Sequence, residues 1–241
     1  CQRDNYRKKK TCHIIILETK LLLHYRIDEI MKNLPHILPL FPLDGVVMFP
    51  NTYLPLNIFE PRYLKMIDHS MSQESRLIGM IQPKKSSDQN RNVDLHDVGC
   101  AGRIIKFEET EDSRYLITLK GVSRFKLLSD TTNKDSFREA KINWNEFSGD
   151  LSEEGSDDSF VSLKKGLKQF FKFKKMKVNM EIIESCNDYN FVDQITMICP
   201  LANEEKQLLL ETISIARRND LLKSILESYS EEPNTTIKMK H

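Results

Sequence analysis

The spacing of apolar residues changes once along this chain, and that change limits the folds it can adopt. Between residues 36 and 147, short runs of branched and aromatic residues are separated by turn residues, as in β-strands. Between residues 160 and 229, apolar residues recur at the spacing of one helix face. Strands followed by helices, rather than alternating with them, are typical of an α+β fold.

The first part predicts short strands and one helix. The strands are expected at Ile37–Phe41, Val46–Phe49, Leu77–Ile81, Val98–Glu108, Arg114–Lys120 and Val122–Leu128. The fourth and fifth form a predicted antiparallel hairpin, in which Leu116 interrupts the alternation of apolar and polar residues. Pro61 is expected to begin the helix, because proline suits the first helical turn.

The second part predicts helices with recognisable ends. The first begins at Phe160 and carries seven lysines and no acid as far as Lys177. The second, Phe191–Cys199, is ended by Pro200. Asn203 and Ser214 are candidate caps for two further helices.

Composition suggests five segments. Residues 1–30 are predicted to be a non-native or disordered leader, because the chain starts with Cys1 and its first methionine is Met31. Residues 34–147 form the predicted β-rich subdomain, and 160–229 the helical one. Residues 148–159 hold five acids and no base and predict a flexible linker. Residues 230–241 are predicted to be a disordered tail.

Charge and cysteine content narrow the classes of partner. The chain has 36 Lys and Arg against 35 Asp and Glu, so it has no overall field that would select nucleic acid or anionic lipid. It also lacks a run of about 20 apolar residues, so no membrane span is expected. Five cysteines without a CxxC pair predict neither a disulfide framework nor a metal site. A reducing cytoplasm is the predicted compartment.

Sequence motifs of common enzymes are missing from this chain. The eight glycines form no phosphate-binding GxxxxGK[ST] loop, no dinucleotide fingerprint and no GxSxG turn. The carboxylates between Glu108 and Asp112 are expected at a solvated hairpin tip, where their pKa values would not suit acid–base catalysis. The sequence therefore predicts no catalytic residue and no cofactor.

Several segments, in order, resemble one family. These are Leu38-Pro-Leu-Phe-Pro-Leu43, Val47-Met-Phe-Pro50, Leu54-Pro-Leu-Asn-Ile-Phe-Glu-Pro-Arg-Tyr63, Gly121-Val-Ser-Arg-Phe125, Phe191-Val-Asp-Gln-Ile-Thr-Met-Ile-Cys-Pro200 and Glu205-Lys-Gln-Leu-Leu-Leu-Glu211. Together they resemble the Lon-protease N-terminal, or substrate-binding, domain family, in its short stand-alone bacterial form. The resemblance spans residues 34–229.

This resemblance implies a PUA-like, β-rich pseudo-barrel followed by an α-helical bundle. In full-length Lon proteases the domain precedes ATPase and Ser/Lys peptidase modules and helps to hold unfolded substrates. Neither module is recognisable here, so the resemblance implies a non-enzymatic binding module that could serve as an adaptor in protein quality control. Its expected partners are unfolded or hydrophobic polypeptides and a protease.

Most residues of the matching segments have structural explanations. The residues of these segments to which we assign a structural role are Pro42, Pro50, Glu60, Pro61, Arg62, Tyr63, Gly121, Arg124 and Phe125. The charged members stand among apolar neighbours, so they must pair or reach solvent. We expect at least one of the two arginines to bond a carboxylate or a backbone carbonyl.

Two functional hypotheses remain open from the sequence. For polypeptide binding, the candidate residues are Phe41, Met48, Phe49 and Phe59, although large apolar side chains are normally buried. The alternative is RNA binding through the PUA-like fold and the basic helix Lys164–Lys177, although those lysines equally suit a solvated helix face. The oligomeric state cannot be read from the sequence.

Overall fold

The computed structural model describes residues 29–84, 93–151, 160–185 and 190–230. The first half contains β1 (Ile37–Pro42), β2 (Tyr53–Ile58), α2 (Pro61–Ser72), β3 (Leu77–Ile81), β4 (Val98–Glu109), β5 (Tyr115–Thr132), β6 (Arg138–Asn143) and the 3-10 helix η1 (Asn145–Leu151). The second half contains α3 (Val161–Phe173), α4 (Met180–Ser185), α5 (Phe191–Ile198), α6 (Asn203–Glu211) and α7 (Ile215–Ser230). The segregation of strands and helices confirms the α+β class.

The strands close into a barrel. The sheet order is β2-β5-β4-β3-β1-β6, and β6 also pairs with β5, which joins β5, β4, β3, β1 and β6 into a ring. All pairings are antiparallel except that of β1 with β3. Strand β2 lies outside the ring as an edge strand on β5. This arrangement confirms the β-rich pseudo-barrel.

Strand β5 is continuous where the sequence predicted a break at Gly121. Its first part pairs with β2 and β4, and its last part pairs with β6. Gly121 is required for another reason: a Cβ atom there would lie 1.9 Å from the carbonyl oxygen of Phe49. The glycine therefore admits the close approach of the Phe49–Pro50 backbone and does not end the strand.

The predicted strand Val46–Phe49 is wrong, and the strand Tyr53–Ile58 was missed. Residues 46–49 are an irregular segment, although Val47, Met48 and Phe49 are all buried. A tight turn follows, in which the Thr52 hydroxyl donates a 2.6 Å hydrogen bond to the carbonyl oxygen of Phe49. A short apolar run indicates burial but not strand geometry, which explains the error.

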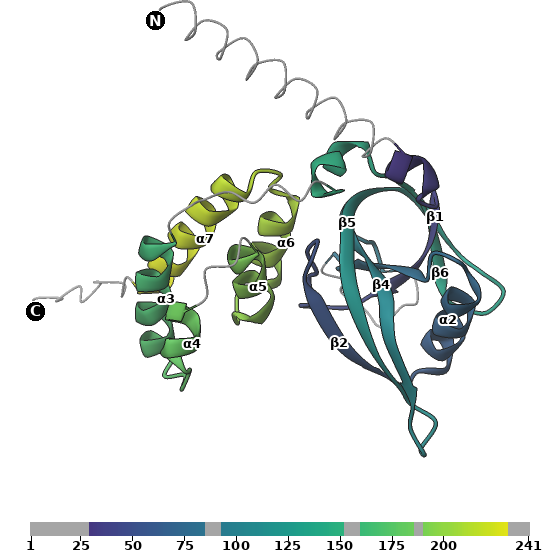
Figure 1. The fold of residues 1–241 in the computed structure, drawn as a ribbon, viewed down its shortest axis with the longest axis horizontal. Coiled ribbons are helices and arrows are strands. Elements are labelled where there is room, and N and C mark those ends of the chain that lie inside the picture. The colour runs from purple at the N-terminus through teal and green to yellow at the C-terminus, as the bar shows by residue number, and fades with distance from the viewer. Residues whose placement is uncertain (1–28, 85–92, 152–159, 186–189, 231–241) are drawn as a thin grey trace, which may run out of the picture.

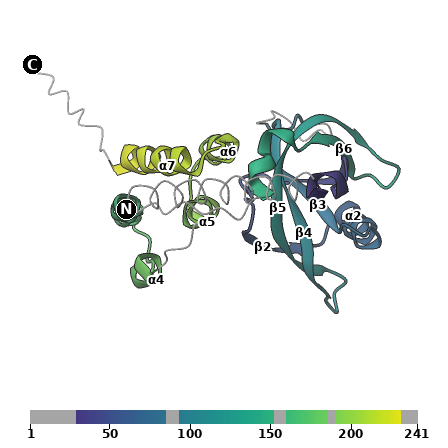
Figure 2. The same ribbon diagram turned by 45° about the horizontal axis from the view of Figure 1, so that its top comes forward.

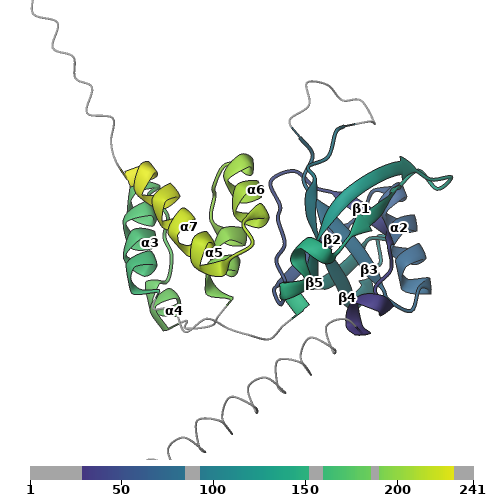
Figure 3. The same ribbon diagram turned by 90° about the horizontal axis from the view of Figure 1, so that it is seen from above.

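Helices α3 to α7 lie on one side of the barrel, and α2 lies on the opposite side (Figures 1, 2 and 3). Helix α7 packs along α3 and also contacts α5 and α6. One hydrophobic cluster extends through both halves, from Phe49 and Ile117 in the barrel to Leu163 and Leu222 in the helices. The barrel and the helices therefore share a core and pack as one unit.

Several predicted helix ends shift. Helix α3 stops at Phe173, and Lys175 has a left-handed φ of 52°, so the basic segment ending at Lys177 is only partly helical. Asn203 does not cap α6 but is its first residue, and its amide donates to Asp44 at 2.7 Å. Helix α4 was not predicted.

The predicted segment boundaries change where the structure describes them. Residues 148–151 belong to η1, so the chain is ordered four residues beyond the predicted start of the linker. Residues 29–33 are helical, so the predicted leader boundary at residue 30 falls within a helix. The rest of the predicted leader, linker and tail (1–28, 152–159 and 231–241) lies outside the described residues. No described helix is long and apolar enough to cross a membrane.

Substituting Gly121 with Ala is expected to destabilise the protein by about 1–3 kcal/mol or more, because the new methyl group would displace the Phe49 backbone. The matched control is Gly149→Ala, where an added Cβ meets no atom within 4 Å; we expect a change within about 0.5 kcal/mol. Urea unfolding measures both. Equal stability of the two variants would contradict the close approach.

Candidate functional site

A buried arginine joins the barrel to the helical half. Arg124 lies on β5 and is 1% exposed. Its Nε and Nη2 donate to the two carboxylate oxygens of Asp150 in η1, at 2.9 and 2.6 Å. The remaining donors reach the carbonyl oxygens of Leu210, in the last turn of α6, and of Thr212 and Ile213, in the turn to α7. Arg124 thus links β5, η1 and the helices.

A second buried arginine meets the first at the same turn. Arg218 of α7 donates two hydrogen bonds to Asp193 of α5, at 2.8 and 3.1 Å. Its Nη1 donates to Thr212 and Ile213 carbonyl oxygens. Thr212 O therefore accepts from both arginines. Burial raises the pKa of the Asp193 carboxyl, and the Arg218 guanidinium opposes this rise.

The local sequence explains why two guanidinium groups gather here. The last carbonyl groups of a helix have no intrahelical donor, and the three residues that follow Glu211 turn the chain sharply into α7. Guanidinium groups carry five donors each, which suits these carbonyls and a carboxylate together. We infer that this cluster holds the two halves in register.

Substituting Arg124 with Ala is expected to cost about 3–5 kcal/mol of stability, because it leaves Asp150 and the carbonyl groups buried without their partner. Arg62→Ala is the matched control, since its pair with Glu60 is about half exposed and should contribute about 0–1 kcal/mol. Thermal and urea unfolding measure both variants. A loss for Arg124→Ala no larger than the control's would refute the bridging role.

Side-chain amides and a lysine complete the contact between the halves. Gln82, at the end of β3, donates to the Asn203 carbonyl and to the Gln207 side chain at 3.1 Å. Lys206 of α6 donates to the Gly45 carbonyl oxygen at 3.0 Å. Burial lowers the pKa of Lys206 and raises the pKa of the neighbouring Cys199 thiol from 9.0 to about 12.

The Cys199 pKa predicts a loss of stability in alkali. Between pH 9 and 12 the unfolded chain loses the thiol proton and the folded chain keeps it, so the free energy of unfolding falls by about 1.4 kcal/mol per pH unit from this group. Deprotonation of Lys206 changes the free energy of unfolding in the opposite direction, because its pKa is lowered in the folded state. The Cys199→Ala variant should therefore lose less stability than the wild-type chain between pH 9 and 10.5, as measured by urea unfolding. Parallel pH profiles would contradict this assignment.

The residues predicted to bind polypeptide separate into two groups. Phe41, Met48 and Phe49 are 6%, 0% and 0% exposed and lie in the core, whereas Phe59 is 62% exposed. The three buried side chains offer no surface to a partner. Phe59 directly follows β2, and the Arg114 guanidinium lies over its ring at 5.8 Å.

The other residues of the matching segments are spread over the barrel. Tyr63 is buried in α2, where its ring packs 4.4 Å from that of Phe41. Phe125 is buried on β5. Glu60 and Arg62 form an ion pair of 2.8 Å at the start of α2, next to Pro61 in its first turn. Pro42 ends β1, and Pro50 is buried beside Gly121. These positions do not converge on one site.

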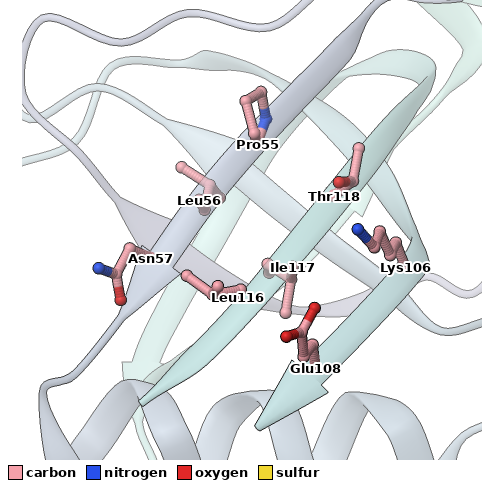
Figure 4. A pocket seen from close by; sticks show the side chains of 8 residues that line it. All are labelled: Pro55, Leu56, Asn57, Lys106, Glu108, Leu116, Ile117 and Thr118. Atoms are coloured by element: carbon pink, nitrogen blue, oxygen red, sulfur yellow. The ribbon is translucent and has the colours of Figure 1, made fainter. Parts of the chain in front are cut away.

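A shallow groove lies on the outside of the sheet formed by β2, β5 and β4. It has a volume of about 340 Å³ and is lined by Pro55, Leu56, Asn57, Lys106, Glu108, Leu116, Ile117 and Thr118. Figure 4 shows Leu116 between Asn57 of β2 and Glu108 of β4, with Lys106 near Thr118. Leu116 is 39% exposed, and Tyr53, at the other end of β2, is 58% exposed. The groove combines an apolar floor with two charged side chains, Lys106 and Glu108, on its β4 side.

The groove adjoins an unpaired strand edge. Strand β2 pairs only with β5 in the sheet. The Gly121 amide donates to the Thr52 carbonyl oxygen, and backbone groups alternate in direction along a strand. The backbone carbonyl groups of Tyr53, Pro55 and Asn57 therefore point away from β5. The backbone amides of Tyr53 and Asn57 do the same, and Pro55 has no N–H to donate. A proline at such a position is typical of an edge strand.

Sequence reasoning missed this groove, although one signal was visible. Leu116 breaks the apolar–polar alternation of its strand, and the structure places it on the solvent side, where an apolar residue is unexpected. The remaining lining residues come from three strands, and only the register places Asn57, Leu116 and Glu108 side by side.

The lysines of α3 line an exposed helix face. Lys165, Lys168 and Lys172 are exposed, whereas Lys164 donates to the Glu184 carbonyl oxygen and lies over the Phe191 ring. Lys174 lies 4.3 Å from the Tyr229 ring centroid. Among the described residues there is no cluster of His, Cys, Asp or Glu that could hold a metal ion.

Comparison with known proteins identifies the family. Residues 37–228 match the family model described as the ATP-dependent protease La (LON) substrate-binding domain. Because this match covers most of the sequence, the chain belongs to the LON substrate-binding domain family, which confirms the resemblance seen in the sequence.

Individual relatives and solved structures agree with this assignment. The chain is 26% identical over 198 residues to the Lon protease of Buchnera aphidicola subsp. Acyrthosiphon pisum, covering 79% of this chain and 25% of that protein. It is 26% identical to Lon protease 1 of Syntrophobacter fumaroxidans, covering 88% and 26%. The chain thus spans about a quarter of these relatives' length.

Two solved structures share the fold. The Lon N-terminal domain protein from Xanthomonas campestris matches with a TM-score of 0.53 at 20% identity, covering 78% of this chain and 97% of that one. The N-terminal domain of Mycobacterium avium complex Lon protease matches with a TM-score of 0.56 at 14% identity, covering 79% and 98%.

Proposed function

We propose that this chain binds extended, unfolded polypeptide segments that carry apolar side chains. The observation that carries the proposal is the groove of about 340 Å³ around Leu116, beside the unpaired edge of β2. The substrate-binding role named by the family description supports it. An exposed strand edge next to an apolar surface can hold an extended chain without regard to its overall sequence.

The binding mode uses backbone and side-chain contacts together. A segment laid along β2 receives amide donors from Tyr53 and Asn57, while Pro55 supplies only its carbonyl oxygen. Because alternate side chains of a strand share a face, every second side chain of the segment lies toward the groove. An apolar side chain there removes surface of Leu116 and Pro55 from water.

The proposed role is binding without catalysis, as an adaptor for a protease in protein quality control. The lack of recognised hydrolase motifs in the sequence supports a binding role. Relatives of this chain are named Lon proteases, so a protease is the proposed partner. The cytoplasm remains the predicted compartment.

The groove favours polypeptide over RNA as the partner. The RNA hypothesis rested on the PUA-like fold and on the basic segment Lys164–Lys177, and two lysines of that segment, Lys164 and Lys174, are engaged with other parts of the chain. The exposed part of α3 presents Phe173 and Val161 but no paired aromatic platform on which bases would stack.

Substituting Leu116 with Asp is expected to weaken binding of a fluorescent twelve-residue peptide, containing one leucine among serines and threonines, by about tenfold. The change puts a charge on the apolar floor and removes an aliphatic contact. Fluorescence anisotropy of the full chain measures the dissociation constant, and thermal melting verifies folding.

The matched control is Val161→Asp, which changes an apolar residue that is 73% exposed on α3, away from the groove. We expect its affinity to equal that of the wild-type chain. Equal weakening by both substitutions, or none by Leu116→Asp, would contradict the placement of the site in the groove.

A further inference from the structure

The register of β2, β5 and β4 arranges nine side chains in three rows. We call these residues the outer face: Tyr53, Lys120 and Arg103 in the first row, Pro55, Thr118 and Lys106 in the second, and Asn57, Leu116 and Glu108 in the third. Directly paired residues of antiparallel strands project to the same side of the sheet. A bulge near Ile105 keeps Arg103 and Lys106 on this side.

The charges of the outer face are unequal from end to end. The first two rows contain three cations and no acid, whereas the third row contains Glu108. Beyond the third row, the hairpin tip carries Glu109, Glu111 and Asp112, of which Asp112 pairs with Arg114. The face is therefore cationic toward Tyr53 and anionic toward the tip of the hairpin.

The three cations are available to a partner. Arg103, Lys106 and Lys120 are exposed, and none of them forms a salt bridge within the described part of the chain. Arg103 also lines, with Arg76 and Glu74, a second open depression of about 580 Å³ beside the end of α2. Unpaired cations next to an apolar pocket are complementary to a ligand that combines an apolar group with carboxylates.

We propose that the outer face selects extended polypeptide segments in which acidic side chains lie two and four residues from an apolar one. The inference rests on the proposed function and specifies its substrate class. With the apolar side chain nearest Leu116, the spacing of alternate residues in a strand, about 7 Å, places the next two side chains on that side of the segment level with the row of Lys106 and then with the row of Lys120 and Arg103. These cations lie on β5 and β4, across β2 from the segment, so they attract the acids at a distance. Glu108 and the hairpin tip repel an acid at the other end.

The test compares fluorescent twelve-residue peptides that differ only in charge. Each has one leucine among serines and threonines, with aspartates or lysines two and four positions away, either before or after the leucine. At low salt, the full chain should bind an aspartate peptide about three- to tenfold more tightly than the matching lysine peptide, the size expected of several charges that attract across one or two strands at low ionic strength. The preference should shrink as salt is added. The better of the two orders gives the direction of the segment.

Charge-reversal variants test whether Lys106 and Lys120 cause the preference for aspartate peptides. The double variant K106E/K120E should lose or invert the preference for aspartate, and the control variant K165E/K168E on α3 should keep it. Equal affinity for aspartate and lysine peptides would overturn this inference and leave the proposed function intact. If no peptide binds, or if single-stranded RNA displaces the aspartate peptide at equal concentration, both proposals fail.

Discussion

The arrangement of this molecule depends on the burial of Arg124. Its guanidinium group bonds Asp150 and three carbonyl groups at the end of α6 and in the turn that follows, and Arg218, held by Asp193, shares two of those carbonyls. Buried ion pairs gain little over well-packed apolar groups but are costly to break. We infer that this cluster specifies one docking of the helices on the barrel, while the shared hydrophobic core supplies most of the favourable free energy.

When the helices pack on the barrel, some residues of the matching segments are buried between the two halves. Phe49 and Met48 face the junction core, and the Arg218 guanidinium lies over the Phe49 ring at 5.4 Å. The side of the sheet formed by Tyr53, Leu116 and Lys106 faces solvent instead. The surface open to a partner is therefore built from residues outside most of the segments by which the family is recognised.

Much of the fold follows from local patterns. Leu77–Ile81, β4 and the start of β5 were predicted to within one residue, because alternation and turn residues act locally. The irregular path of Val46–Phe49 and the continuity of β5 through Gly121 were not, because both depend on one backbone approaching another from far along the chain. Asn203 likewise serves a contact with Asp44 rather than a cap.

The sequence alone determined the α+β class and the family. It also showed charged residues within apolar segments, which had to pair with another group or reach solvent. It determined these because period, turn chemistry and segment order are properties of the linear chain. Only the tertiary structure decided that Phe41, Met48 and Phe49 are core, that Arg124 bridges the two halves, and that Leu116 lies in a groove with Lys106 and Glu108. Burial and charge environment depend on which strands pair and in what register, and a shift of one residue would move every side chain to the opposite face.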